Sequence, residues 1–272
     1  MRTRYLFAAL KNRLDPQQTV ALSLAVRDWV RPSGAQVVGL SPSAAALAWA
    51  SGCRGELALA AQACGWGAPY ALTGELTVRD LQVFSADYCL VGHSERRLYL
   101  GETEAVIAHR LGALLSGGII PILCVGETLE QHRGHGGFAA IRAQLMSLRS
   151  AHEASKVPPD PARIIVAYEP MWAISTSGSN LEASPGDVVT MHGAIRAELD
   201  MLFGSGFGSA TSVLFGGGVE EGNAASYLDQ PQIDGALVGA GMETASGFLG
   251  VLAAFYGRGG RDRERPDNPT VL

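Results

Sequence analysis

Lysine is nearly missing from this chain, whose 21 basic residues comprise 19 arginines and only two lysines, Lys11 and Lys156. The net charge is −5, and the 26 acidic residues are spread along the sequence, so nothing indicates binding to nucleic acid or to an anionic membrane. Long hydrophobic runs are also lacking, because the alanine-rich stretch after Ser41 is broken by Arg54 and Glu56. We therefore expect neither nucleic acid nor a membrane as a partner.

Cysteine is scarce as well, and its spacing fits neither a metal site nor a redox motif. The four cysteines stand at positions 53, 64, 89 and 124 and form no C-x-x-C pair. So few cysteines in 272 residues are typical of buried, reduced thiols in a cytoplasmic protein. The first residues, MRTRYLFAALKN, contain too short an apolar run for a secretory signal. The sequence predicts a cytoplasmic location and, without metal-ligand spacing, no metal.

What the sequence does contain is a regular alternation of strand-like and helical segments. The expected strands are 5–10, 36–40, 56–63, 88–92, 119–126, 164–169, 212–217 and 235–239. The expected helices are 16–30, 43–50, 102–116, 138–148, 184–199, 222–228 and 244–256. The helix at 184–199 has strong start signals, because Ser184 can cap it, Pro185 suits its first turn and Asp187 favours its positive end.

Strict alternation of strand and helix predicts parallel strands with helical crossovers. Eight such units in roughly 250 residues favour a closed barrel over an open, doubly wound sheet. We therefore predict an α/β protein with a single (β/α)8 barrel of eight parallel strands over residues 1–256. The tail, 257–272, is charged and has no periodicity, so we expect it to be disordered.

Candidate catalytic groups stand at the carboxyl ends of the strands, where barrel enzymes carry their working residues. Lys11 follows the first expected strand, His93 the fourth and Glu169 the sixth. Taken singly, these could be a solvated lysine, a satisfied core histidine and an ion-paired carboxylate. The seventh and eighth strands end in FGGGV (215–219) and LVGAGM (237–242), whose glycines let backbone N–H groups approach an anion such as phosphate.

Together, the four strand ends match proton abstraction next to a carbonyl group. The carboxylate of Glu169 would take a proton from carbon, while His93 and Lys11 would stabilise the oxygen on which charge develops. The segment FGGGVEEG is not a dinucleotide fingerprint, because no suitable acidic partner follows it. We therefore expect a reaction without a cofactor.

Three segments resemble the triosephosphate isomerase family: VGHSERR (91–97), AYEPMWAI (167–174) and FGGGVEEGNAASYL (215–228) followed by DGALVG. With TGE (73–75) and CVGE (124–127) also in place, the resemblance extends from Lys11 to near residue 252. It implies a cofactor-free aldose–ketose isomerase of glycolysis and gluconeogenesis, acting on a small phosphorylated sugar. The expected reaction interconverts glyceraldehyde 3-phosphate and dihydroxyacetone phosphate through an enediolate.

The same resemblance implies roles for individual residues. Glu169 becomes the base that moves a proton between adjacent carbons, and His93 a neutral electrophile beside a helix N-terminus, both taken over from the family. Lys11 becomes the cation near the substrate oxygens, and Glu95 supports the site from behind. The substrate-binding residues implied are Lys11, Ser175, Gly216, Gly217, Gly218, Gly239 and Ala240.

Two longer segments also receive roles from the resemblance. Pro170, Met171 and Trp172 become the first hinge of a lid that extends from Ala173 to about Ser184 and excludes water from the reaction. The loop 67–75 would insert beside Lys11 of a second subunit. The resemblance therefore implies a homodimer.

Several positions depart from the family pattern, and they leave the substrate open. Ala9 stands where the family has asparagine, Gly218 replaces a serine, and Ala240 replaces a glycine. The lid segment AISTSGSNLEASP and the loop 67–75 are also longer than usual. The alternatives are therefore an isomerase of a related four-carbon ketose phosphate, of the erythrulose phosphate type, or a barrel that binds a phosphorylated ligand without catalysis.

Overall fold

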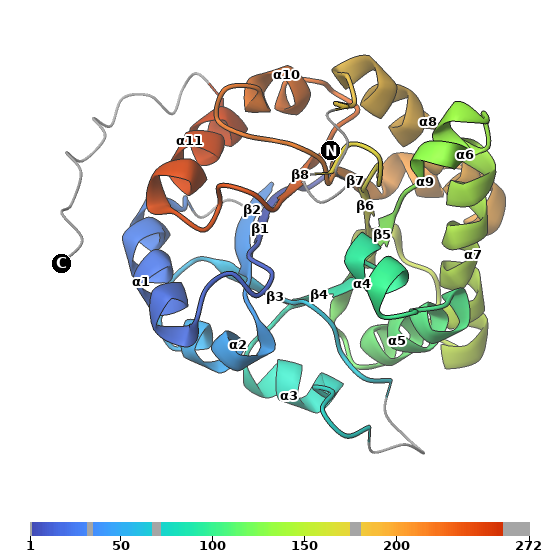
Figure 1. Cartoon of the computed structure of the whole chain (residues 1–272). Coiled ribbons are helices and arrows are strands. Elements are labelled where there is room, and N and C mark those ends of the chain that lie inside the picture. The colour runs from blue at the N-terminus through green and yellow to red at the C-terminus, as the bar shows by residue number, and fades with distance from the viewer. Residues whose placement is uncertain (1, 32–34, 67–71, 175–180, 258–272) are drawn as a thin grey trace.

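The chain folds into a closed barrel of eight parallel strands, seen in a computed structural model that describes residues 2–31, 35–66, 72–174 and 181–257 (Figure 1). Each strand pairs with the next along the chain, and β8 pairs back with β1. The strands are β1 (Arg4–Ala9), β2 (Gln36–Ser41), β3 (Ala58–Ala61), β4 (Tyr88–Val91), β5 (Ile120–Val125), β6 (Ile165–Tyr168), β7 (Ser212–Phe215) and β8 (Gly235–Val238). The predicted fold class is confirmed.

Helices surround the barrel on all sides (Figure 1). In the described residues they are α1 (Pro16–Val26), α2 (Ala44–Ser51), α3 (Val78–Val83), α4 (Ser94–Tyr99), α5 (Glu104–Ser116), α6 (Leu129–Arg133), α7 (Gly137–Ser155), α8 (Pro185–Phe203), α9 (Phe207–Ala210), α10 (Ala224–Leu228) and α11 (Ala245–Tyr256), with the 3-10 turns η1 (Arg27–Trp29) and η2 (Pro161–Arg163). None of the described helices is long and apolar enough to cross a membrane.

Some expected boundaries were wrong. The helix expected over 16–30 ends at Val26 and tightens into η1. The helix expected over 138–148 is longer, because its buried face continues to Ala151 and the helix ends only where Lys156 takes a left-handed φ of 61°. The strand expected over 56–63 shortens to β3. The start of α8 is as predicted, since the Ser184 side chain accepts from Asp187 N in a capping box.

The period-two alternation of the strands sorts their side chains between two cores. On β1, Tyr5, Phe7 and Ala9 point into the barrel, while Leu6 and Ala8 pack against the helices. All four cysteines are free, and those at positions 64, 89 and 124 are buried as predicted. Cys53 is the exception, because it is only partly buried. The expected disorder of the tail concerns residues 258–272, which lie outside the described residues.

The amino end of the barrel is fastened by one buried carboxylate. Asp234, which precedes β8 and is 4% exposed, pairs with Arg2 at 2.7 Å and with Arg196 of α8 at 2.5 Å. The same carboxylate accepts a hydrogen bond from Val213 N at 2.8 Å. These bonds connect the residues that precede β1 and β8 with β7 and α8, at the end opposite to the predicted catalytic residues.

Candidate active site

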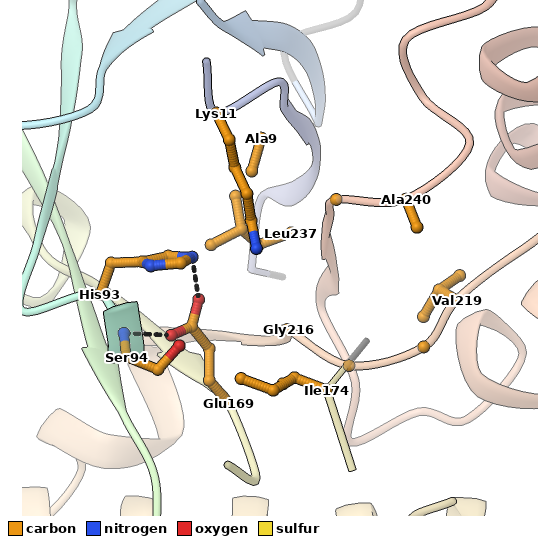
Figure 2. A pocket seen from close by; sticks show the side chains of 13 residues that line it. Ala9, Lys11, His93, Ser94, Glu169, Ile174, Gly216, Val219, Leu237 and Ala240 are labelled. Atoms are coloured by element: carbon orange, nitrogen blue, oxygen red, sulfur yellow. Dashed lines mark hydrogen bonds and ion pairs between the residues drawn. The ribbon is translucent and has the colours of Figure 1, made fainter. Parts of the chain in front are cut away.

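A pocket opens at the carboxyl ends of the strands (Figure 2). Its walls come from β1, β4, β6, β7 and β8 or from the loops that follow them, and they contain Ala9, Lys11, His93, Ser94, Glu169, Ile174, Gly216, Gly217, Gly218, Val219, Leu237, Gly239 and Ala240. The structure therefore brings together Lys11, His93 and Glu169, which are far apart in the sequence. Of the other predicted site residues, Glu95 does not line the pocket, and Ser175 lies outside the described residues.

Glu169 reaches the pocket because of its position one residue beyond β6. Ala167 points into the barrel and Tyr168 points out, so the next side chain turns inward again. Glu169 is only 4% exposed, and its Oε2 atom accepts a hydrogen bond from Ser94 N at 3.0 Å. A Cβ atom at Gly216 would lie 2.7 Å from Glu169 Cγ, so only glycine at that position leaves room for the carboxylate.

His93 faces Glu169 across the pocket, with its Nε2 atom 3.3 Å from Glu169 Oε1 (Figure 2). Gly92, with a φ of 69°, turns the chain after β4 so that His93 becomes the N-cap of α4. There the His93 Nδ1 atom accepts a hydrogen bond from Glu95 N at 3.3 Å. This contact uses Nδ1, so Nε2 is the ring nitrogen that faces the Glu169 carboxylate.

Lys11 stands at the end of β1 in a left-handed conformation, with a φ of 51° that a residue other than glycine seldom adopts. Gln62 holds this turn, because its Nε2 atom donates to Lys11 O at 2.6 Å and to Ser41 O at 3.0 Å. The Lys11 Nζ atom lies 2.7 Å from Glu95 Oε1. Glu95 thus contacts two residues of the pocket: its side chain pairs with Lys11, and its backbone N–H donates to His93.

The loops after β7 and β8 form the opposite wall of the pocket. Within the described part of the chain, the N–H groups of Gly217, Gly218 and Ala240 have no protein acceptor. Gly216 serves another purpose, because its N–H donates to Tyr168 O at 2.7 Å. The wall can therefore offer an anion several backbone donors, although not that of Gly216.

Comparison with known proteins agrees with this geometry. The family model described as triosephosphate isomerase matches residues 5–255. The chain belongs to the triosephosphate isomerase family. A triosephosphate isomerase from Thermus thermophilus is 44% identical over 183 residues, which is 67% of this chain and 70% of the relative. One from Symbiobacterium thermophilum is 37% identical over 223 residues, which is 82% of this chain and 84% of the relative.

The departures from the family pattern fall on the walls of the pocket. Ala9, Gly218 and Ala240, the positions at which the sequence was expected to depart from the family, all line it together with Glu169 and His93. Among the residues that the structure describes, no group of three His, Cys, Asp or Glu side chains could hold a metal ion. Residues 67–71 of the loop predicted to reach a second subunit, and residues 175–180 of the predicted lid, lie outside the described residues.

A buried carboxylate behind the pocket was not singled out from the sequence. Glu127 is completely buried, and its Oε1 atom accepts hydrogen bonds from Tyr168 OH at 2.9 Å and from Trp172 Nε1 at 2.7 Å. Burial, and then the charge of Glu127, raise the pKa of Tyr168 far above its usual value. The segment CVGE contained the signal, since a carboxylate directly after a buried strand needs donors. Glu127 fixes the two residues that flank the turn beyond Glu169.

The thiol beside the base is not a second reactive group. Cys124 points into the barrel below Glu169, and burial followed by the nearby Glu169 carboxylate raises its pKa well above that of a free thiol. A thiolate, rather than a thiol, is the nucleophilic form of cysteine. Cys124 therefore stays protonated, and Glu169 remains the predicted base.

Proposed function

We propose that this protein interconverts glyceraldehyde 3-phosphate and dihydroxyacetone phosphate through an enediolate, without a cofactor. The observation that carries the proposal is the pair of the buried Glu169 carboxylate and the His93 imidazole, 3.3 Å apart, in one pocket. The sequence match to triosephosphate isomerases supports it. The substrate class is therefore a small phosphorylated sugar.

In the proposed mechanism, Glu169 removes a proton from one carbon and returns it to the neighbouring carbon. To do so, its carboxylate leaves Ser94 N and turns to the substrate. His93 donates a hydrogen bond from Nε2 to the oxygen on which negative charge develops, and it can also pass a proton between the two oxygens. A neutral imidazole suits both steps, because it can give up a proton and accept one.

Lys11 and the glycine loops would bind and orient the substrate. The Lys11 ammonium group lies in the pocket, and Glu95 holds it from outside the pocket. The free N–H groups of Gly217, Gly218 and Ala240, next to Gly239, are the proposed phosphate donors. Ser175 remains a predicted phosphate contact, and its position is outside the described residues. Binding a non-reacting phosphate at this wall positions the reacting carbons at Glu169.

A substrate panel tests the proposal. A coupled assay should show rapid turnover of glyceraldehyde 3-phosphate and little with erythrulose phosphates, because the relatives compared are named triosephosphate isomerases. Faster turnover of the four-carbon sugar would instead favour the changed substrate that Ala9 and Gly218 leave open. Silence with every substrate, together with binding of a phosphorylated enediolate mimic, would indicate the non-catalytic barrel.

We further propose a homodimer in the cytoplasm. At the end of α4, the helix that begins beside His93, Leu98, Tyr99 and Leu100 are 53%, 70% and 65% exposed. Three consecutive apolar side chains that are exposed in a single chain are typical of a surface that binds another protein chain. A partner there would lie behind Lys11 and His93, which agrees with the role predicted for the loop 67–75. Sedimentation should give the mass of two chains, and a fully active monomer would overturn the dimer.

A further inference from the structure

The His132 ring, on α6, lies on the Trp172 ring just beyond β6. The two ring centroids are 4.1 Å apart, and the ring planes are inclined by 29°. The Nδ1 atom of His132 is also 3.5 Å from Glu127 Oε1, the oxygen that accepts hydrogen bonds from Trp172 and Tyr168. One imidazole therefore contacts both the tryptophan and the carboxylate that hold the turn next to Glu169.

The segment around Glu169 is tied to the end of β5 by its backbone as well. Glu169 N donates to Val125 O at 2.7 Å, and Met171 N donates to Glu127 O at 3.0 Å. With the side-chain bonds of Tyr168 and Trp172 to Glu127, these contacts fix the residues before and after the base. Any change in the Glu127–Trp172 contact therefore acts on the orientation of Glu169.

A charge on His132 would strengthen this arrangement. Glu127 has a fully buried side chain, and its Oε2 atom has no hydrogen-bond partner in the described chain, so its negative charge is poorly compensated. Among the residues described, His132 is the only basic side chain at ion-pair distance from Glu127. A protonated imidazole would pair with that carboxylate and would also be attracted by the face of the tryptophan ring.

The other charged and titratable groups near His132 do not offer Glu127 a cation. Tyr168 faces Glu127 from β6 as a neutral donor, and Asp187 of α8 adds negative charge near Tyr168. Arg142 of α7 pairs with Glu198 of α8 at 3.3 Å. The remaining groups stand on or next to α6: Glu130, Arg133 and His135.

We propose that His132 is a positioning residue whose protonation holds the turn Pro170–Trp172, and with it Glu169, in the orientation seen here. In this orientation the base is occupied by Ser94 N and His93, so it must move to reach a substrate carbon. The charged form of His132 opposes that movement. Turnover is therefore slower when His132 is charged than when it is neutral.

Tryptophan fluorescence tests the contact without requiring any activity. A protonated imidazole stacked on an indole quenches its emission, so emission should fall as the pH is lowered from about 8 to 5.5. This change should shrink in His132→Gln and in Trp172→Phe. The chain offers a matched control, because His109 stacks on Trp66 with centroids 6.0 Å apart. His109→Gln should retain the part of the change that His132→Gln removes.

The kinetic arm rests on the proposed isomerase activity. We expect kcat of His132→Gln to exceed that of the unchanged protein about threefold near pH 6 and to equal it near pH 8, with KM little changed, since a half-exposed ion pair contributes modestly. His132→Arg, which is charged at every pH, should lower kcat about threefold near pH 8. His109→Gln should follow the unchanged protein throughout.

Two results would overturn the positioning role. One is a fluorescence change that His132→Gln leaves intact. The other is a ratio of kcat values between His132→Gln and the unchanged protein that stays constant with pH or falls at low pH. Equal melting temperatures of the variants near pH 8 exclude misfolding as the cause. Absence of isomerase activity in every variant, including the unchanged protein, would contradict the proposed function instead. The fluorescence measurement would still test the contact between His132 and Trp172.

Discussion

The two ends of the barrel each bury one carboxylate to the same extent, and the two carboxylates have opposite surroundings. Asp234 at the amino end and Glu169 at the carboxyl end are both 4% exposed. Asp234 is bonded to two guanidinium groups and a backbone N–H. Glu169 has one backbone N–H and the imidazole of His93.

The different surroundings fit different roles: Asp234 stabilises the fold, and Glu169 reacts with the substrate in the proposed mechanism. The oxygens of Asp234 are occupied by two guanidinium groups and a backbone N–H, so the charge of this carboxylate is compensated within the protein. Glu169 lacks a cation as a direct partner among the described residues, since Lys11 is instead paired with Glu95. Its charge is therefore available to a substrate proton. Equal burial of two carboxylates does not predict the same role for them; the charge and the donors around each one do.

The largest expected effect comes from neutralising the base. Glu169→Gln should lower kcat at least about 1000-fold, because an amide cannot take a proton from carbon. KM and the melting temperature should change little, since the amide keeps an oxygen for Ser94 N. Steady-state kinetics measures kcat and KM, and calorimetry on the same preparation measures the melting temperature. Near-normal turnover in this variant would remove the mechanism.

Neutralising Asp234 should lower stability and leave kcat unchanged, the opposite of the effect expected for Glu169. Asp234→Asn should lower the free energy of unfolding by about 3 kcal/mol, because Arg2 and Arg196 lose their buried counter-charge. The kcat of the folded fraction should stay unchanged. Chemical denaturation and kinetics at low temperature check this. A loss of kcat without a loss of stability would show that Asp234 affects the reaction, which contradicts the separate roles given to the two ends of the barrel.

A buried histidine on α8 predicts how stability depends on pH. His192 is fully buried, and burial lowers its pKa from 6.5 to about 4. The unfolded chain then binds the proton first, so stability is complete above pH 6.5 and is lost as the pH falls towards 4. The loss reaches about 3 kcal/mol at 1.36 kcal/mol per pH unit.

Denaturation curves at several pH values, compared with those of His192→Gln, measure this contribution. The difference in unfolding free energy between the two proteins should shrink as the pH is lowered through that window. A difference that does not vary with pH would mean that His192 does not titrate on unfolding. Other carboxylates contribute to the total pH dependence, which is why the comparison with the variant is needed.

The smallest of these effects concerns the space around the base. A methyl group at Gly216 would lie 2.7 Å from Glu169 Cγ. Gly216→Ala should therefore displace the carboxylate and lower kcat about 100-fold, as displacements near 1 Å do. Gly222→Ala is the matched control, because nothing lies within 4 Å of a Cβ atom there. Equal activities in the two variants would contradict the crowding argument.

The sequence predicted the barrel and the three central side chains because each depends on local pattern. Alternation of strand and helix sets the architecture, and the positions of Lys11, His93 and Glu169 after three strands place them at the same end of the barrel. The short helices α3, α6 and α9 were not predicted, because six residues or fewer give little helical periodicity, and α4 was implied only by the family resemblance.

The support behind the site was not predictable from local pattern, because its partners are distant in the sequence. Glu127 bonds with side chains 41 and 45 residues further along the chain. Nothing local shows that His132 stacks on Trp172, since that contact depends on how α6 packs beside β6. Likewise, the bond between the Gly216 N–H and Tyr168 O depends on how the ends of β6 and β7 pack together. Such contacts are set by tertiary packing.

The most direct test of the central claim, that Glu169 and a neutral His93 act on one substrate, is a crystal structure with a phosphorylated enediolate mimic bound. We expect Glu169 to have left Ser94 N and to lie within about 3 Å of the mimic's reacting atoms, with His93 Nε2 donating to its oxygens. The phosphate should lie against Gly217, Gly218 and Ala240. A mimic bound elsewhere, or bound with Glu169 still on Ser94 N and His93 turned away, would contradict the account.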